Sequence, residues 1–284
     1  MRISNHYLFG LVLGLSLTGQ VLAVDYVQGV DVSHYQGSIN WAAAKGAGIQ
    51  FAFAKATEGV DFVDDRFIAN MNGARAAGVL IGPYHFARLN SGETNASDAV
   101  NEANDFVDAI EPFYQQYPSA MLRPVLDLEN LPDDPVSPSV KAYVSKWTRD
   151  FNQRVKDRLG FIPIVYTGGN FAQNYVETNI NQFPLWFAKP TSTNVFANAS
   201  LPTASNIGVW SDWTFWQWSW VGQVSGISGD VDRDVYKGTL QQLKQQFGAV
   251  PEPDGFALAA ILSSILLAVG FRSKARLSWC RTRR

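Results

Sequence analysis

Residues 124–167 read PVLDLENLPDDPVSPSVKAYVSKWTRDFNQRVKDRLGFIPIVYT, with two short apolar runs on either side of a longer amphipathic segment. The runs Pro124–Leu128 and Ile162–Thr167 have the length and composition of buried strands. Between them, Ser137 is suited to cap a helix and Pro138 to occupy its first turn. Apolar residues then recur at helical spacing: Val140, Val144, Trp147, Phe151, Val155 and Leu159. A strand, a helix and a second strand in this order are typical of a parallel sheet with crossover helices.

The same alternation continues on both sides of this unit. Six further apolar runs have the character of strands: Val27–Val32, Phe51–Ala56, Val79–Tyr84, Leu185–Ala188, Phe215–Ser219 and Val231–Val235. A second amphipathic helix is marked by apolar Ala96, Val100, Ala103, Val107 and Ile110, with Asp98, Glu102, Asp105 and Asp108 facing outward. The segments that join the last three strands, such as Pro190–Trp213, lack a helical period. Eight strands with helices only in the first part predict an α/β fold, an incomplete (β/α) barrel.

Composition excludes several classes of protein. Of the 284 residues, 46% are hydrophobic and 17% charged, so the chain can form a large core and is not intrinsically disordered. Residues 24–249 carry 16 Lys and Arg against 23 Asp and Glu, a net charge of −7 that opposes binding to nucleic acid. The single cysteine, Cys280, excludes an intrachain disulfide and a multi-cysteine zinc site. We expect no metal and no cofactor, although His34 and His85 could still join carboxylates at a metal.

Residues 1–23 have the features of a secretory signal peptide. A positive residue, Arg2, precedes the apolar run Leu8–Leu17, and Val21–Ala23 places small residues at the positions that determine cleavage. The apolar run is short for a membrane span, although an uncleaved membrane anchor is the alternative. We therefore expect an exported protein.

Residues 250–284 form a second targeting segment. The stiff linker Val250-Pro251-Glu252-Pro253 comes before the 17-residue uncharged stretch Gly255–Phe271, and six basic residues follow. Because basic residues stay on the cytoplasmic side, the preceding domain would face outward. Pro-Glu-Pro, an apolar helix and a basic tail in this order resemble the PEP-CTERM sorting signal of Gram-negative bacteria. That resemblance implies cleavage by an exosortase-type protease; the alternative is a plain C-terminal membrane anchor. We expect one domain at 24–249 between the two segments.

Carboxylates stand at the ends of several predicted strands, where a (β/α) barrel has its active site. Asp31 lies near the end of the first strand, Asp127 and Glu129 close the fourth, and Asp232 lies in the eighth. Side chains at i and i+2 of a strand share a face, with Cα atoms roughly 6.5–7 Å apart, so Asp127 and Glu129 would both face the barrel interior. Burial and mutual repulsion would raise one pKa, as a general acid at neutral pH requires. The alternative is a solvated turn after a strand.

Aromatic residues accompany these acids. The chain has nine Trp, ten Tyr and 18 Phe, and four rings lie at or near predicted strand ends: Tyr84, Tyr166, Trp186 and Trp216. Each ring is a candidate sugar platform, with core packing as the alternative. In the run 213–220, period two places Trp216, Trp218 and Trp220 on one side and Gln217 and Ser219 on the other. Periodicity does not say which side faces a substrate. Acids around a cleft bordered by aromatic rings suit glycoside hydrolysis.

Six motifs in order resemble those of the glycoside hydrolase family 25 lysozymes, the Chalaropsis type. They are Asp31-Val32-Ser33-His34-Tyr35-Gln36-Gly37, Phe53-Ala54-Lys55-Ala56-Thr57-Glu58-Gly59, Gly82-Pro83-Tyr84-His85-Phe86, Asp127-Leu128-Glu129, Trp216-Gln217 and Val231-Asp232. The resemblance covers roughly residues 27–240. It implies a flattened (β/α)5(β)3 barrel of the TIM-like class. It also implies a lysozyme that hydrolyses the β-1,4 bond between N-acetylmuramic acid and N-acetylglucosamine in peptidoglycan.

The resemblance also implies roles for individual residues. Glu129 would protonate the departing glycosidic oxygen, and Asp127 would flank the scissile sugar on the other side. Asp31 and Asp232 would hold substrate hydroxyls or tune the pKa of Glu129. Sugar contacts would come from Tyr84, Tyr166, Trp186 and Gln217, with Trp216 as a further candidate. The nucleophile is open between a carboxylate and the acetamido group of the substrate, oriented by Asp127; we favour the latter.

Two features depart from the family pattern. After Val231-Asp232 the family usually has an apolar residue and Asn, whereas this chain has Arg233 and Asp234. The cell-wall-binding repeats that often accompany the family are not found in this sequence. We expect a monomeric, exported muramidase whose partners are peptidoglycan strands, the processing protease and, through the C-terminal segment, the membrane. The alternatives are a catalytically silent glycan-binding surface protein on the same barrel and a metal-dependent hydrolase.

Overall fold

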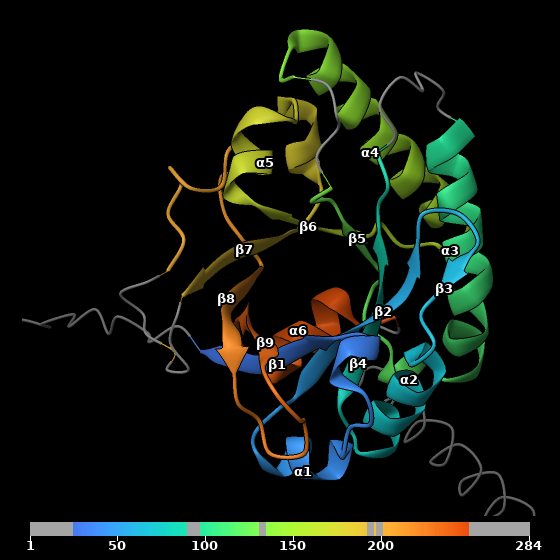
Figure 1. Ribbon diagram of the computed structural model, residues 1–284, viewed down its shortest axis with the longest axis vertical. Coiled ribbons are helices and arrows are strands. Elements are labelled where there is room, and N and C mark those ends of the chain that lie inside the picture. The colour runs from blue at the N-terminus through green and yellow to red at the C-terminus, as the bar shows by residue number, and fades with distance from the viewer. Residues whose placement is uncertain (1–24, 90–96, 131–134, 192–195, 197–200, 250–284) are drawn as a thin grey trace, which may run out of the picture.

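Eight strands close into a barrel (Figure 1). The computed structural model describes residues 25–89, 97–130, 135–191, 196 and 201–249. The barrel strands are β1 (Tyr26–Val32), β2 (Phe51–Glu58), β4 (Leu80–Phe86), β5 (Val125–Asp127), β6 (Ile164–Gly168), β7 (Leu185–Thr191), β8 (Phe215–Gly222) and β9 (Val231–Lys237). Pairing between β1 and β2 closes the ring, and all neighbours are parallel except β9, which runs antiparallel to β8 and β1. All eight predicted strands are confirmed. A short strand that was not predicted, β3 (Phe62–Val63), forms a hairpin with β2.

Helices follow the first five barrel strands. They are α1 (Trp41–Gly46), α2 (Phe67–Ala76), α3 (Ser97–Gln116), α4 (Pro138–Leu159) and α5 (Gly169–Asn174), and α6 (Leu240–Phe247) comes after the last strand. The described residues also contain three 3₁₀ turns: η1 (His34–Gln36), η2 (Pro118–Ala120) and η3 (Thr178–Gln182). In the described residues between β7 and β9 no helix occurs. The architecture is therefore the (β/α)5(β)3 barrel that was expected.

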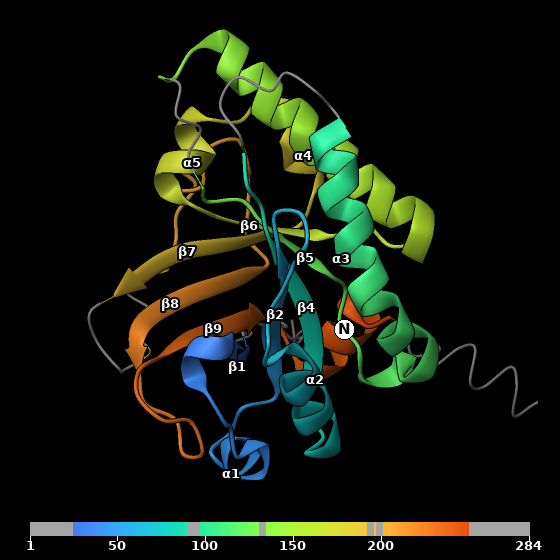
Figure 2. The same ribbon diagram turned by 45° about the vertical axis from the view of Figure 1, so that its right-hand side comes forward.

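Helices α3 and α4 lie side by side on the outside of the barrel (Figure 2). The predicted cap of α4 is confirmed, because the Ser137 side chain accepts a hydrogen bond from the Val140 amide at 3.2 Å. The prediction that Asp98 and Glu102 of α3 face outward is wrong, since both are buried. Glu102 contacts Nε2 of His85, a residue of β4, at 2.7 Å. This polar partner allows the carboxyl group to be buried between α3 and β4.

The barrel interior is filled by large side chains. Phe51 and Phe53 of β2 pack against Phe215 of β8, with ring centroids 5.5 and 5.4 Å apart. Glycines make this possible, because a Cβ on Gly29 would lie 2.3 Å from the Phe51 ring and one on Gly82 would lie 2.9 Å from the Phe53 ring. The inner strand faces therefore carry bulky rings in the middle of the barrel.

Helix α6 closes one end of this interior. Phe247 of α6 packs against Phe215, the first residue of β8, and against Tyr236 of β9, at centroid distances of 5.3 and 6.0 Å. Leu243 of the same helix is fully buried in the same cluster. The opposite end, formed by the carboxyl ends of the parallel strands, is the one available for a site.

The two predicted targeting segments, residues 1–23 and 250–284, lie outside the described residues. No helix in the described part of the chain is both long and apolar enough to cross a membrane.

Candidate active site

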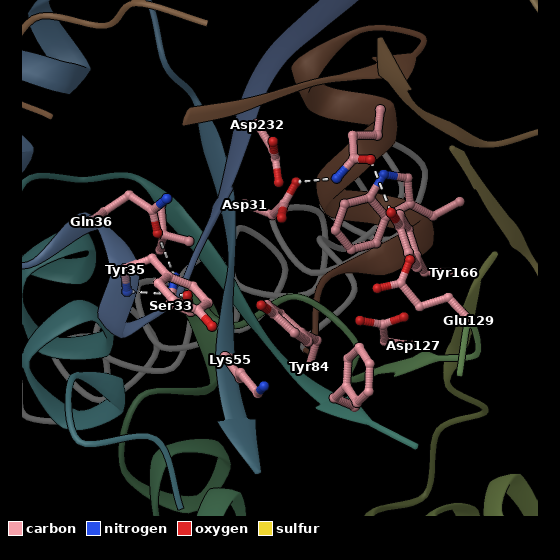
Figure 3. Close-up of a pocket in the computed structure, with 14 residues that line it drawn as sticks. Asp31, Ser33, Tyr35, Gln36, Lys55, Tyr84, Asp127, Glu129, Tyr166 and Asp232 are labelled. Atoms are coloured by element: carbon pink, nitrogen blue, oxygen red, sulfur yellow. Dashed lines mark hydrogen bonds between the residues drawn. The ribbon is translucent and has the colours of Figure 1, made fainter. Parts of the chain in front are cut away.

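A pocket of about 210 Å³ opens at the carboxyl ends of the parallel strands (Figure 3). It is lined by Asp31, Val32, Ser33, Tyr35, Gln36, Lys55, Tyr84, Phe86, Asp127, Glu129, Tyr166, Trp186, Gln217 and Asp232. We call it the acidic pocket, because it brings together all four carboxylates that the sequence placed at strand ends.

Strand register explains why these four acids meet. Asp31 is the penultimate residue of β1, and Asp127 is the last residue of β5. Asp232 lies near the start of β9, but β9 is antiparallel, so its start lies beside the end of β1 and Asp232 pairs directly with Asp31. Glu129 lies two residues beyond β5. The sequence analysis extended this strand to Leu128; the structure ends it earlier and still directs both acids into the pocket.

Asp127 and Glu129 form one wall of the acidic pocket (Figure 3). Burial, and then the charge of Glu129, raises the pKa of Asp127 well above its usual range. Burial also raises the pKa of Glu129, and the nearby Lys55 ammonium partly opposes both shifts. One Asp127 oxygen, Oδ1, is buried without a hydrogen-bond partner, whereas Glu129 is exposed at the pocket rim. Burial and mutual repulsion therefore favour a state in which Asp127 and Glu129 share one proton.

Asp31 stands on the opposite wall and is part of a hydrogen-bonded chain. Its Oδ2 accepts from Nε2 of Gln217 at 2.9 Å, and Oε1 of Gln217 accepts from the Tyr166 hydroxyl, also at 2.9 Å. The indole Nε1 of Trp220 donates to the same Gln217 oxygen at 3.1 Å. Gln217 is therefore held from three sides, and its amide orientation is fixed by these bonds.

Asp31 also belongs to a group of three acids. Burial, and then the charge of Asp234, raises the pKa of Asp31 well above its usual range. Burial, followed by the charge of Asp31, raises the pKa of Asp232 to about 9. Burial and the charge of Asp232 raise the pKa of Asp234 strongly. Burial and mutual repulsion therefore favour the protonated forms of these carboxyl groups on two paired strands.

Three of the predicted aromatic contacts line the acidic pocket: Tyr84, Tyr166 and Trp186. Trp216 does not line this pocket, and the alternative given for it, core packing, describes its position. Successive side chains of β8 point to opposite faces, so the strand that directs Gln217 inward directs Trp216 outward. There its ring packs 6.1 Å from that of Trp213, and its Nε1 donates to the Lys189 carbonyl at 3.1 Å.

Several pocket residues were not predicted as site residues. Lys55, Ser33, Tyr35, Gln36 and Phe86 all lie in the quoted motifs but were given no role. The signal for Lys55 was present, since Phe51, Phe53 and Lys55 alternate on one face of a strand and the first two fill the barrel. Among the described residues, no group of three or more His, Cys, Asp or Glu side chains is arranged to hold a metal ion.

The profile of Glycosyl hydrolases family 25 matches residues 30–227. Lysozyme M1 of Streptomyces globisporus is 36% identical over 222 residues, which cover 76% of this chain and 70% of that protein. The N,O-diacetylmuramidase of Chalaropsis sp is 29% identical over 224 residues, which cover 72% of this chain and 96% of that protein.

Solved structures are similar over the same region. The bacterial lysozyme from Streptomyces coelicolor has a TM-score of 0.59 and 34% identity, over 76% of this chain and 94% of that chain. A family 25 glycosyl hydrolase from Bacillus anthracis has a TM-score of 0.62 and 28% identity, over 77% of this chain and 92% of that chain.

Proposed function

The chain belongs to glycosyl hydrolase family 25 and is a lysozyme-type hydrolase of peptidoglycan, and on that premise we propose that the acidic pocket is its active site. The bond cleaved there is the β-1,4 bond between N-acetylmuramic acid and N-acetylglucosamine. One observation carries the assignment: Asp127 and Glu129 share a pocket wall that faces Asp31 and Asp232 at the open end of the barrel.

Glu129 acts as the general acid. It lies at the rim, where a polymer can reach it. The protein around its carboxyl group limits hydration and raises its pKa, which favours the protonated form that a general acid needs. The reaction needs that proton on the glycosidic oxygen as the bond to the anomeric carbon breaks. The alternative donor, Asp127, is buried below the rim and is less accessible to the bridging oxygen.

Asp127 orients the substrate. Its carboxylate lines the acidic pocket and is suited to accept the N–H of the acetamido group of the muramic acid residue. Accepting this bond favours the ionised form of Asp127, which leaves the shared proton on Glu129. The acetamido oxygen then attacks the anomeric carbon, and a water molecule opens the resulting ring in the second step.

The remaining pocket residues hold the same sugar. Asp31 and Asp232 bind polar groups of this sugar, and Gln217 is fixed beside Asp31 as a further hydrogen-bonding group. The rings of Tyr84, Tyr166 and Trp186 surround the sugar on the remaining sides. A pocket that combines carboxylates with aromatic walls matches the polar substituents and the apolar faces of a pyranose.

Release of reducing ends from purified peptidoglycan tests this active site. The wild-type protein is expected to release them, and Glu129→Gln, which keeps the shape of the side chain but cannot donate a proton, is expected to lose nearly all release. A circular dichroism spectrum confirms that the variant is folded. Unchanged turnover by the folded variant would remove Glu129 from the role of general acid.

The choice of nucleophile has its own test. Glycan strands from which the N-acetyl groups have been removed lack the attacking oxygen, and we expect their hydrolysis to be at least ~100-fold slower. If Asp127 were itself the nucleophile, a fluorinated slow substrate would leave a sugar covalently attached to it, detectable by mass spectrometry of the intact protein.

Residues 1–23 and 250–284 are proposed to direct this enzyme to the cell envelope. The basic tail, the apolar stretch and the Pro-Glu-Pro sequence support a sorting signal that is cleaved after export. Mass spectrometry of the native protein is expected to give a mature chain that begins near residue 24 and ends near Glu252. A chain that retains residues 255–284 would instead support a C-terminal membrane anchor.

A further inference from the structure

A second cavity, of about 290 Å³, lies directly beside the acidic pocket. It is lined by Glu129, Tyr166, Gly168, Gly169, Asn170, Phe171, Ala188, Pro190 and Trp220, and we call it the α5 cavity because it lies at the start of that helix. Glu129 and Tyr166 belong to both linings. The proposed general acid therefore lies on the boundary between two adjoining spaces.

The two spaces differ in chemistry. The acidic pocket contains four carboxylates and one lysine, whereas the α5 cavity has Glu129 as its single carboxylate and no Lys or Arg in its lining. Its other polar side chains are the Asn170 amide, the Tyr166 hydroxyl and the Trp220 indole N–H. Such a lining suits an uncharged polar ligand that has an apolar face.

Trp220 provides a fixed aromatic surface at the edge of this cavity. It is 60% exposed, although large apolar side chains of this barrel are mostly buried. Its Nε1 donates to Gln217 at 3.1 Å, and the Tyr166 hydroxyl donates to the same oxygen. The indole is thus anchored by its polar edge while much of its ring remains accessible, an arrangement that lets an aromatic ring pack against a ligand without a large loss of side-chain entropy.

Gly168 and Gly169 keep the cavity open. Neither residue has a positive φ angle. A Cβ at Gly168 would meet no atom closer than 4.0 Å and one at Gly169 none closer than 3.6 Å, so packing would accept a side chain at either position. Neither the backbone conformation nor the packing therefore requires glycine at these two positions. The absence of side chains there leaves space that a ligand can use.

We infer that the α5 cavity binds the sugar of the leaving group, N-acetylglucosamine, and that Trp220 is the platform on which this sugar packs. This inference rests on the proposed function. The anomeric carbon that is attacked must lie beside Asp127, in the acidic pocket. The bridging oxygen receives its proton from Glu129 and departs with the next sugar, which must then lie beyond Glu129, where the α5 cavity is found.

Two substrates that differ in their leaving group provide the test. In a peptidoglycan strand the leaving group is a sugar that fills the α5 cavity. In the glycosyl fluoride of the disaccharide N-acetylglucosaminyl-N-acetylmuramic acid the leaving group is a fluoride ion, which is too small to reach Trp220. For Trp220→Ala we expect the ratio of kcat/KM on the strand to kcat/KM on the fluoride to fall by about tenfold or more.

Two further variants separate the ring from its hydrogen bond. Trp220→Phe keeps an aromatic ring but lacks the N–H that contacts Gln217, and we expect it to recover most of the ratio. Val221→Ala removes the neighbouring exposed side chain, which lines neither space, and should leave the ratio as in the wild type.

An unchanged ratio in Trp220→Ala, or an equal fall on both substrates, would overturn the inference, because the tryptophan would then act only through Gln217. A wild-type protein that cleaves neither substrate would overturn the proposed function itself. The two failures are therefore distinguishable.

Discussion

The indole Nε1 of Trp186 donates a hydrogen bond of 2.9 Å to Oδ1 of Asp234, joining a ring that lines the acidic pocket to a carboxyl group that is completely buried behind it. The other oxygen of Asp234, Oδ2, has no hydrogen-bond partner. A buried, half-satisfied carboxylate is costly, whereas a protonated carboxyl group can donate its own hydrogen bond. Burial and the charge of Asp232 accordingly raise the pKa of Asp234.

Asp234→Asn is expected to stabilise the protein at alkaline pH. A carboxyl group whose pKa is raised by folding contributes its full stability below its ordinary value of 3.8, and this contribution is lost as the pH rises toward the folded value. Asparagine stays neutral at every pH and avoids this loss. We expect Tm at pH 8 to rise by roughly 3–10 °C, and the gain to shrink as the pH falls toward 4.

The matched control for this variant is Asp230→Asn. Asp230 is an exposed acid just before the same strand, where it accepts a hydrogen bond from Gln223. Its substitution should leave the pH dependence of Tm unchanged. Equal curves for the wild type and Asp234→Asn between pH 4 and pH 8 would show that Asp234 is ionised in the folded protein.

Glu129→Gln should lower kcat on peptidoglycan by about 10²–10⁴-fold with little change in KM, because the lost proton transfer acts only in the transition state. On the disaccharide fluoride the loss should be much smaller, since fluoride departs without protonation. Steady-state kinetics on both substrates measure this difference. Equal losses on the two substrates would assign Glu129 to binding.

Lys55→Met should move the pH–rate profile to higher pH. The Lys55 ammonium opposes the effect of burial on Asp127 and Glu129, so its removal raises the pKa of both carboxyl groups. We expect both limbs of the kcat/KM profile to shift upward by up to about 1 pH unit. Lys146→Met on the surface of α4 is the control and should leave the profile in place. A downward shift would contradict the assigned electrostatics.

Trp216→Ala tests the position of this side chain outside the acidic pocket. The side chain is buried on the outer face of the barrel, so we expect its loss to lower the free energy of unfolding by about 3–5 kcal/mol. Denaturant titration measures this loss. The KM of the remaining folded enzyme should match that of the wild type, whereas a sugar-binding residue would raise KM.

The strands and the acids at their ends could be predicted from sequence because both follow local patterns. Short apolar runs separated by turn residues identify every strand from β1 to β9 except β3, which has only two residues. The residues Asp127 and Glu129 remain on one face of the chain even though the regular strand ends at Asp127.

The inward and outward sides of β8 could not be predicted. Both faces of this strand are buried, so Trp216 and Gln217 are equally compatible with the core, and only the pairing of β8 with β7 and β9 determines which one faces the pocket. The same holds for Asp234. Its burial depends on the antiparallel register between β9 and β1, in which it lies opposite Gly29.

The prediction that the acids of α3 face outward was wrong for a different reason. Helical periodicity assigns Glu102 to a polar face, but the interface with β4 contains His85, and burial lowers the pKa of this histidine to about 3 and raises that of Glu102 to about 8. Burial therefore favours the uncharged form of the pair, with the proton on Glu102. A long-range pair of this kind has no signature in the local sequence.

The identity of the sugar at the new reducing end tests the central claim most directly. Peptidoglycan digested by the purified protein is reduced with borohydride, and the released fragments are analysed by mass spectrometry. Cleavage with the muramic acid residue in the acidic pocket and N-acetylglucosamine in the α5 cavity predicts that every new reducing end is N-acetylmuramic acid. Fragments that end in reduced N-acetylglucosamine would contradict both the proposed bond and the direction of the strand across Glu129.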